Sequence, residues 1–132
     1  MKPEWQQAIY TADLKKINEL LTNNIDVNSK DKYGQTAIMN AARYGYHDVI
    51  QTLLVHGADP DITAKYNLSA LMIAVLNNHV DSVRVLVNSG CDLDIQGGKE
   101  AIGFYQKTAL DLANIQKNQE IIDILTKAQQ AE

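Results

Sequence analysis

The stretch Gly34-Gln-Thr-Ala-Ile-Met-Asn-Ala41 returns 33 residues later as Asn67-Leu-Ser-Ala-Leu-Met-Ile-Ala74. The same shift carries Leu53 to Leu86 and Gly57 to Gly90. A repeat of this length is one supersecondary unit that cannot bury its own apolar face, so neighbouring units must stack on it. The repeat therefore predicts a solenoid, and solenoids mostly offer surfaces to partners.

Length and charge limit the possible functions. The 132 residues leave room for four repeats, and three or more stacked repeats suffice for a stable core. The net charge of −4 argues against nucleic acid or an anionic membrane as a partner. There is no apolar run long enough to span a membrane, no secretion signal, and a single cysteine. We expect a soluble, cytoplasmic protein.

One repeat can be read residue by residue. The turn at 31–34 ends at Gly34, and Thr36 is placed to cap a first helix that runs to about Tyr44. Gly45 ends that helix. A second helix is expected at 48–55, with its valine, isoleucine and leucines on one face and Gly57 behind it.

These residues resemble the ankyrin repeat family. The pattern is visible at 34–61 and again at 67–94, with weaker copies at both ends, where Trp5 takes the core position of Ile38. The resemblance implies an all-α solenoid of stacked helix-turn-helix units with β-hairpin-like fingers. We divide it into a first repeat and N-cap at 1–30, repeats at 31–63 and 64–96, and a long finger with a fourth repeat and C-cap at 97–132.

The interval between the third and fourth repeats is 39 residues, which places six extra residues within 96–107. The glycines in this segment predict a flexible finger, and its apolar side chains favour contact with a partner. Two interpretations stay open, because a lengthened surface loop is tolerated at little cost and because loops often carry function. If the finger acts, the protein is alternatively a regulator or inhibitor of an enzyme or toxin.

Tyrosine recurs in register on the fingers. Tyr33, Tyr66 and Tyr105 share one repeat position, and the residues before them are Lys32, Lys65 and Phe104. A phenol ladder suits partner binding, since tyrosine is enriched at binding hot spots. The alternative is that each ring packs on the next finger as part of the structure.

The resemblance also implies binding positions on the first helix of each repeat. They fall at Arg43, Tyr44, Leu76 and Asn77, with Tyr44 and Leu76 as an apolar centre. Asn28 resembles an asparagine that is hydroxylated in some ankyrin repeats. The alternative for Asn28 is a turn asparagine that bonds its own backbone.

The sequence carries no recognisable catalytic or metal-binding motif. His47 and His56 have no cysteine or carboxylate at the spacing that a metal site needs. His79 falls at the position where the resemblance implies a histidine that braces neighbouring turns. Cys91 takes the repeat position that Ala58 holds in the preceding repeat, which predicts a small buried thiol. We therefore predict a non-enzymatic, monomeric module that binds an unidentified protein and uses no cofactor, metal or small-molecule substrate. An enzyme would need a pocket of convergent polar groups that paired helices do not suggest.

Overall fold

A computed structural model describes residues 1–131, and the regular elements within these residues are all helices. The helices are α1 (Pro3–Tyr10), α2 (Leu14–Thr22), α3 (Ala37–Tyr44), α4 (His47–Val55), the short 3-10 helix η1 (Lys65–Asn67), α5 (Ala70–Leu76), α6 (Val80–Asn88), α7 (Ala109–Gln116) and α8 (Gln119–Gln130).

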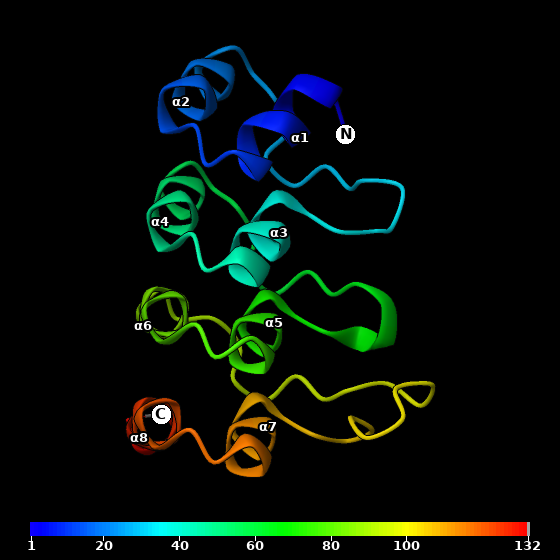
Figure 1. The fold of residues 1–132 in the computed structure, drawn as a ribbon, viewed down its shortest axis with the longest axis vertical. Helices are drawn as coiled ribbons and strands as arrows, with labels where there is room; N and C mark the ends of the chain where they lie inside the picture. The colour runs from blue at the N-terminus through cyan, green and yellow to red at the C-terminus, as the bar shows by residue number, and fades with distance from the viewer. Residues whose placement is uncertain (132) are drawn as a thin grey trace.

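The helices form four layers of two, stacked along the long axis of the molecule (Figure 1). The first helices of the layers, α1, α3, α5 and α7, make one column, and α2, α4, α6 and α8 make the other. Contacts run within each pair and between successive pairs. The long loops project from the side of the first column, away from the second. This arrangement confirms the predicted solenoid.

Local signals set the helix ends. The hydroxyls of Thr36, Ser69 and Thr108 accept hydrogen bonds from the backbone amides of the residues three positions on, at 3.4, 3.3 and 3.3 Å. These bonds confirm the predicted cap at Thr36 and satisfy amides that a helix start leaves without partners. Gly45 ends α3 in the left-handed conformation, with φ of +74°. The second helix of this pair begins at His47, one residue before the predicted start.

The core lies between the layers. Small side chains on the first helices, such as Ala41, Ala74 and Ala113, are fully buried and let the columns approach closely. Leu53 and Leu86 hold the same place in α4 and α6 and are fully buried. Burial of each such leucine is worth about 1.5–3 kcal/mol relative to exposure. Trp5 is also fully buried, as its predicted match to Ile38 requires.

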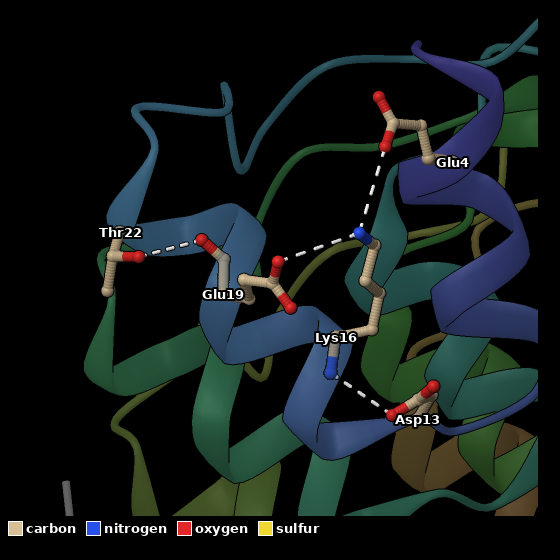
Figure 2. A network of polar contacts seen from close by, with 5 residues as sticks. All are labelled: Glu4, Asp13, Lys16, Glu19 and Thr22. Carbon is tan, nitrogen blue, oxygen red and sulfur yellow. Dashed lines mark hydrogen bonds and ion pairs between the residues drawn. The ribbon is translucent and has the colours of Figure 1, made fainter.

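The first pair has its own polar surface (Figure 2). The Lys16 ammonium lies 3.9 Å from a Glu4 oxygen on α1 and 3.8 Å from a Glu19 oxygen on α2. The Asp13 carboxylate caps α2 by accepting from the Lys16 amide at 3.1 Å. These exposed ion pairs are each worth at most about 1 kcal/mol, so buried packing holds this end of the stack.

Side chains from one repeat position tie each helical turn to the preceding one. Tyr46 Oη donates to the carbonyl of Tyr10 at 3.1 Å, and His79 Nε2 lies 2.9 Å from the carbonyl oxygen of Arg43. In the last pair Asn118 holds this position and bonds Asn78 at 3.2 Å. The predicted brace at His79 is confirmed.

A second line of hydrogen bonds runs along the loops between pairs. Asn28 Oδ1 accepts from the amide of Asp59 at 2.9 Å, and Asp61 Oδ1 accepts from the amide of Asp92 at 2.8 Å. The alternative that Asn28 bonds its own backbone is thereby corrected, because its side chain bonds the next repeat. Asn28 and Asp61 are thus structural side chains that join repeats, whereas Asp59 and Asp92 accept from amides of their own turns.

None of the helices in the described part of the chain has both the length and the apolar character that a membrane crossing needs.

Candidate partner-binding surface

The finger at 31–35 is a tight, internally bonded turn. One oxygen of the Asp31 carboxylate accepts from the amides of Tyr33 at 2.8 Å and Gln35 at 3.0 Å. The Asp31 amide in turn donates to the carbonyl of Gln35 at 2.9 Å. Gly34 takes a φ of +75°, which its lack of a side chain permits. Such a turn presents Tyr33 from a fixed backbone.

The next finger, at 64–68, is more strained. Its ends are joined by a hydrogen bond from the Ala64 amide to the Leu68 carbonyl at 3.1 Å. Tyr66 has a φ of +66° and Asn67 a φ of +57°. For a residue as bulky as tyrosine this conformation costs about 1–2 kcal/mol. The finger that follows stabilises it, since the Gly98 amide donates to the Tyr66 carbonyl at 2.8 Å.

Each of these fingers carries the same lysine and tyrosine pair. Lys32 Nζ lies 5.1 Å from the centroid of the Tyr33 ring, and Lys65 Nζ lies 4.9 Å from that of Tyr66. Both are within the range of cation–π attraction. Tyr33 is 65% exposed and Tyr66 is 37% exposed. The two neighbouring fingers therefore display two matching ammonium and phenol groups to solvent.

The two pairs border one groove of about 420 Å³. It is lined by Lys32, Tyr33, Gln35, Arg43, Lys65, Tyr66, Leu68 and Ile73. The structure thus brings together five of the predicted binding residues and adds Gln35, Leu68 and Ile73. Gln35 and Leu68 share a repeat position, directly before the helix caps, and that register was the available signal for them.

Arg43 lines this groove from α3 and is held in place by hydrogen bonds. Its Nη1 donates to Asn40 Oδ1 at 3.0 Å, and its Nη2 donates to Gln35 Oε1 at 2.9 Å. Both acceptors are neutral oxygens. The guanidinium is therefore oriented by hydrogen bonds that leave its charge uncompensated.

The long finger is closed by its glycines. The Gly97 amide donates to the carbonyl of Lys107 at 3.0 Å, and the Gln106 amide donates back to the carbonyl of Gly97 at 3.0 Å. A Cβ at Gly97 would overlap the carbonyl oxygen of Phe104, so only glycine fits there. In the described residues the fingers are hydrogen-bonded turns, and β pairing is limited to one bridge between Gly97 and Tyr105.

The aromatic residues of this finger do not share one environment. Ile102 is 97% exposed and Tyr105 is 46% exposed, whereas Phe104 is half-buried and packs against the core. The close approach of Phe104 to Gly97 turns its ring inward, so Phe104 offers less surface to a partner than Tyr105 does, and its role in binding stays a prediction. Neither Phe104 nor Tyr105 lines the groove between the two preceding fingers.

Comparison with known proteins supports this description of the fold. A family model of ankyrin repeats in three copies matches residues 5–97, which is well over half of the chain. The chain belongs to the ankyrin repeat family. The match spans the first three helix pairs and ends at the base of the long finger.

A plant protein shares part of this ankyrin sequence. The E3 ubiquitin-protein ligase XBAT33 of Arabidopsis thaliana is 59% identical over 34 residues, which are 26% of this chain and 7% of that protein. The matched stretch is about as long as one repeat. The likeness is therefore one of repeat units, and the chain covers only a small part of the length of this relative.

On the helix face of the ankyrin stack, Tyr44 belongs to an aromatic cluster. Its ring centroid lies 5.7 Å from that of Tyr10 and 5.6 Å from that of Tyr46. Partial burial, with the neighbouring Tyr10 hydroxyl, raises the pKa of Tyr44 above its ordinary value. The predicted apolar centre of Tyr44 and Leu76 omits Tyr10 and Tyr46, because no repeat register links these two tyrosines to Tyr44.

The other predicted residues on this face lie on or just after α5. Leu76 is half-buried against the core, and its carbonyl accepts from Gln116 Nε2 at 2.9 Å. Asn77 is exposed, and its side-chain amide donates to the carbonyl of Ile73 at 2.8 Å. Hydroxylation of Asn28 stays a prediction.

Cys91 is buried, as its replacement of Ala58 predicts. Burial, with the carboxylates of Asp61 and Asp92 nearby, raises the pKa of the Cys91 thiol to about 12. A thiol in this state is a weak nucleophile at neutral pH.

Proposed function

We propose that this ankyrin repeat protein binds a partner protein through its fingers and the adjoining first-helix face. Ankyrin repeats are generally protein–protein interaction modules and are generally non-enzymatic. One observation carries the assignment to this face. The same lysine and tyrosine pair is displayed by two consecutive fingers around a single groove.

The physical chemistry of this face suits protein recognition. Tyrosine gives a large, rigid contact area with a hydrogen-bonding tip, and it is enriched among residues that dominate binding energy. The turns at 31–35 and 64–68 are closed by their own hydrogen bonds, so little backbone freedom remains to be lost on binding. The aromatic cluster around Tyr44 adds further tyrosine rings on the first two layers.

Site-specific crosslinking tests the assignment. A photoreactive amino acid is placed at position 33 or at position 55, and the protein is irradiated in the cells that express it. Val55 is the matched control, because it is 72% exposed but lies on α4, in the column opposite the fingers (Figure 1). We expect a discrete crosslinked partner from position 33 and none from position 55. Crosslinks from position 55 alone would place the binding face elsewhere.

Truncation of the tyrosines then measures their contribution. Replacement of Tyr33 or Tyr66 by alanine costs about 2 kcal/mol or more of binding free energy where the ring is a hot spot. Tyr105→Ala measures the contribution of the long finger separately, because Tyr105 does not line the groove. Unchanged affinity in all three folded variants would contradict the proposal. Light scattering of the free protein tests the accompanying proposal that it is a monomer.

The long finger favours a second candidate function, that of a regulator or inhibitor of an enzyme or toxin. Ile102 is 97% exposed, while the base of its finger is held by the bonds of Gly97 and Gly98. An apolar side chain on an anchored loop suits insertion into a partner's cleft. Ile102→Asp then releases the activity of a bound enzyme while Tyr33-dependent binding persists. Unchanged inhibition by this variant would count against the regulator.

A further inference from the structure

We propose that the groove between the fingers at 31–35 and 64–68 takes an acidic, extended segment of the partner protein. This inference rests on the proposed function and adds the chemistry of the ligand to it. Three cationic side chains line the groove, namely Lys32, Lys65 and Arg43, and none of the acidic side chains in residues 1–131 lines it. The groove is therefore positively charged, although the chain as a whole is acidic, with 16 acidic and 12 basic residues.

The three charges are free to pair with a ligand. Within residues 1–131 none of the three lies within ion-pair distance of a carboxylate, and the ion pairs of the chain involve Lys16, His47 and Arg84 instead. Asp31, which directly precedes Lys32 in the sequence, already accepts hydrogen bonds from its own turn. Its oxygens accept from the amides of Tyr33 and Gln35 and, at 3.5 Å, from Asn40.

The cations are also held in place before any ligand arrives. The two lysines lie against the tyrosine rings of their own fingers, and Arg43 is held by Gln35 and Asn40. A guanidinium has five N–H donors, so three remain for a carboxylate. Charge-assisted hydrogen bonds from oriented donors are stronger than those between neutral groups.

The spacing of the two layers that supply the lysines points to an extended chain with spaced acids. The lysines come from consecutive layers whose helices α3 and α5 pack together, which separates equivalent positions by about 8–10 Å. An extended chain rises about 3.3 Å per residue, so acidic residues about three positions apart match the two lysines. Leu68 and Ile73 give the groove an apolar lining that suits a nonpolar residue between the acids.

Charge also favours a protein segment over nucleic acid. A long polyanion would extend past three cations and meet a surface of net charge −4. The loop acids Asp59, Asp61, Asp92 and Asp94 are exposed and add to this repulsion. A short acidic peptide fits within the groove and so avoids the repulsion from the surrounding acidic surface.

Selection of peptides from a random library tests the inference. Displayed twelve-residue peptides are selected on the wild type, on the double variant Lys32→Gln with Lys65→Gln, and on the control Lys15→Gln with Lys117→Gln. The control lysines are exposed and form no ion pair within the described residues. Their substitution removes the same number of positive charges from the chain as the double variant does. Circular dichroism checks that all three proteins are folded.

We expect the wild type and the control to enrich peptides rich in aspartate and glutamate. Their synthetic versions bind the Lys32 and Lys65 variant at least tenfold more weakly in fluorescence anisotropy, whereas the control binds within twofold of the wild type. Raising the salt from 50 to 300 mM weakens wild-type binding, because screening acts on exposed charges.

Four results would overturn the inference. They are enrichment of neutral or basic peptides, no enrichment at all, equal binding by the double variant, and equally tight binding of a labelled single-stranded DNA 20-mer with the same lysine dependence. Neutral peptides that bind Tyr33→Ala and Tyr66→Ala poorly would overturn the acidic ligand but keep the proposed function. Peptides insensitive to both sets of variants, with no crosslink from position 33, would overturn both.

Discussion

At the scale of single residues, the contact between Gly45 and His79 joins two layers in a space that excludes any side chain. Gly45 has a φ of +74°, and a Cβ there would lie 2.5 Å from Nδ1 of the His79 ring. Gly45→Ala therefore combines a left-handed backbone cost of about 1–2 kcal/mol with an overpacking cost of about 1–3 kcal/mol. We expect urea denaturation to show a loss of about 2–5 kcal/mol in the free energy of unfolding.

Gly34 provides the matched control for this prediction. It has a φ of +75°, and a Cβ there would meet nothing within 4 Å. Gly34→Ala therefore carries only the backbone cost, about 1–2 kcal/mol. Equal losses in the two variants would show that the imidazole contact at Gly45 contributes nothing.

The buried thiol of Cys91 predicts a stability that depends on alkaline pH. Its pKa is raised from 9.0 to about 12, so the folded state favours the neutral thiol. The resulting stabilisation is complete at and below neutral pH and is lost as the pH rises from about 9 to about 12, with a slope of at most about 1.4 kcal/mol per pH unit. Urea denaturation at pH 8, 9 and 10 of the wild type and Cys91→Ala isolates this slope.

Alkylation gives an independent check on the same residue. Only the thiolate reacts, so iodoacetamide at pH 8 modifies the native Cys91 at least about a hundredfold more slowly than it modifies the unfolded chain in urea. Similar rates in the two states would contradict the burial of this thiol.

At the scale of the elements, the loops are joined by side chains that bond the backbone of the next repeat. Asn28 Oδ1 is the acceptor for the amide of Asp59, so Asn28→Ala leaves that donor to water. We expect a loss of about 0.5–1.5 kcal/mol in the free energy of unfolding, measured by urea denaturation. Asn114→Ala is the control, since Asn114 lies exposed on α7 and alanine is the better helix former. A loss no larger than the control's would show that the bond at Asn28 is not stabilising.

The elements also show which features a sequence can predict. Thr36 caps α3 with its own hydroxyl, and Gly45 ends α3 through its own backbone conformation, so both roles follow from local rules and are confirmed. The left-handed Tyr66 depends on a hydrogen bond from Gly98, 32 residues on, and the inward turn of Phe104 depends on the fit at Gly97. Such features arise from contacts between fingers, which repeat register alone does not reveal.

The groove shows the same division between local and tertiary information. Repeat register placed Lys32, Tyr33, Lys65 and Tyr66 on equivalent finger positions, but their arrangement around one groove required the spacing of the layers. Arg43 was predicted from the helix face alone. Its orientation depends on Gln35, a finger residue whose chemistry alone does not mark it as a binding residue.

At the scale of the whole molecule, the helix contacts within residues 1–131 join each layer to its neighbours, so stability is close to a sum of layer and interface terms. The inner layers have two partners and the end layers have one. Within the described residues, α8 packs mainly on α6 of the adjacent layer, whereas an inner helix such as α3 packs on both α1 and α5. This difference predicts that the two ends open more readily than the centre.

Two equivalent leucines test this prediction. Leu53 in α4 and Leu125 in α8 are both fully buried, and replacement of either by alanine costs about 2–5 kcal/mol in its own layer. Because the loss at Leu125 falls on an end layer, hydrogen exchange followed by mass spectrometry should accelerate in α7 and α8 while α3 and α5 stay protected. Leu53→Ala instead weakens an inner layer, which has a layer on each side, and accelerates exchange in every layer. Uniform acceleration in both variants would mean that the stack opens as one cooperative unit, and the nearest-neighbour description would then fail.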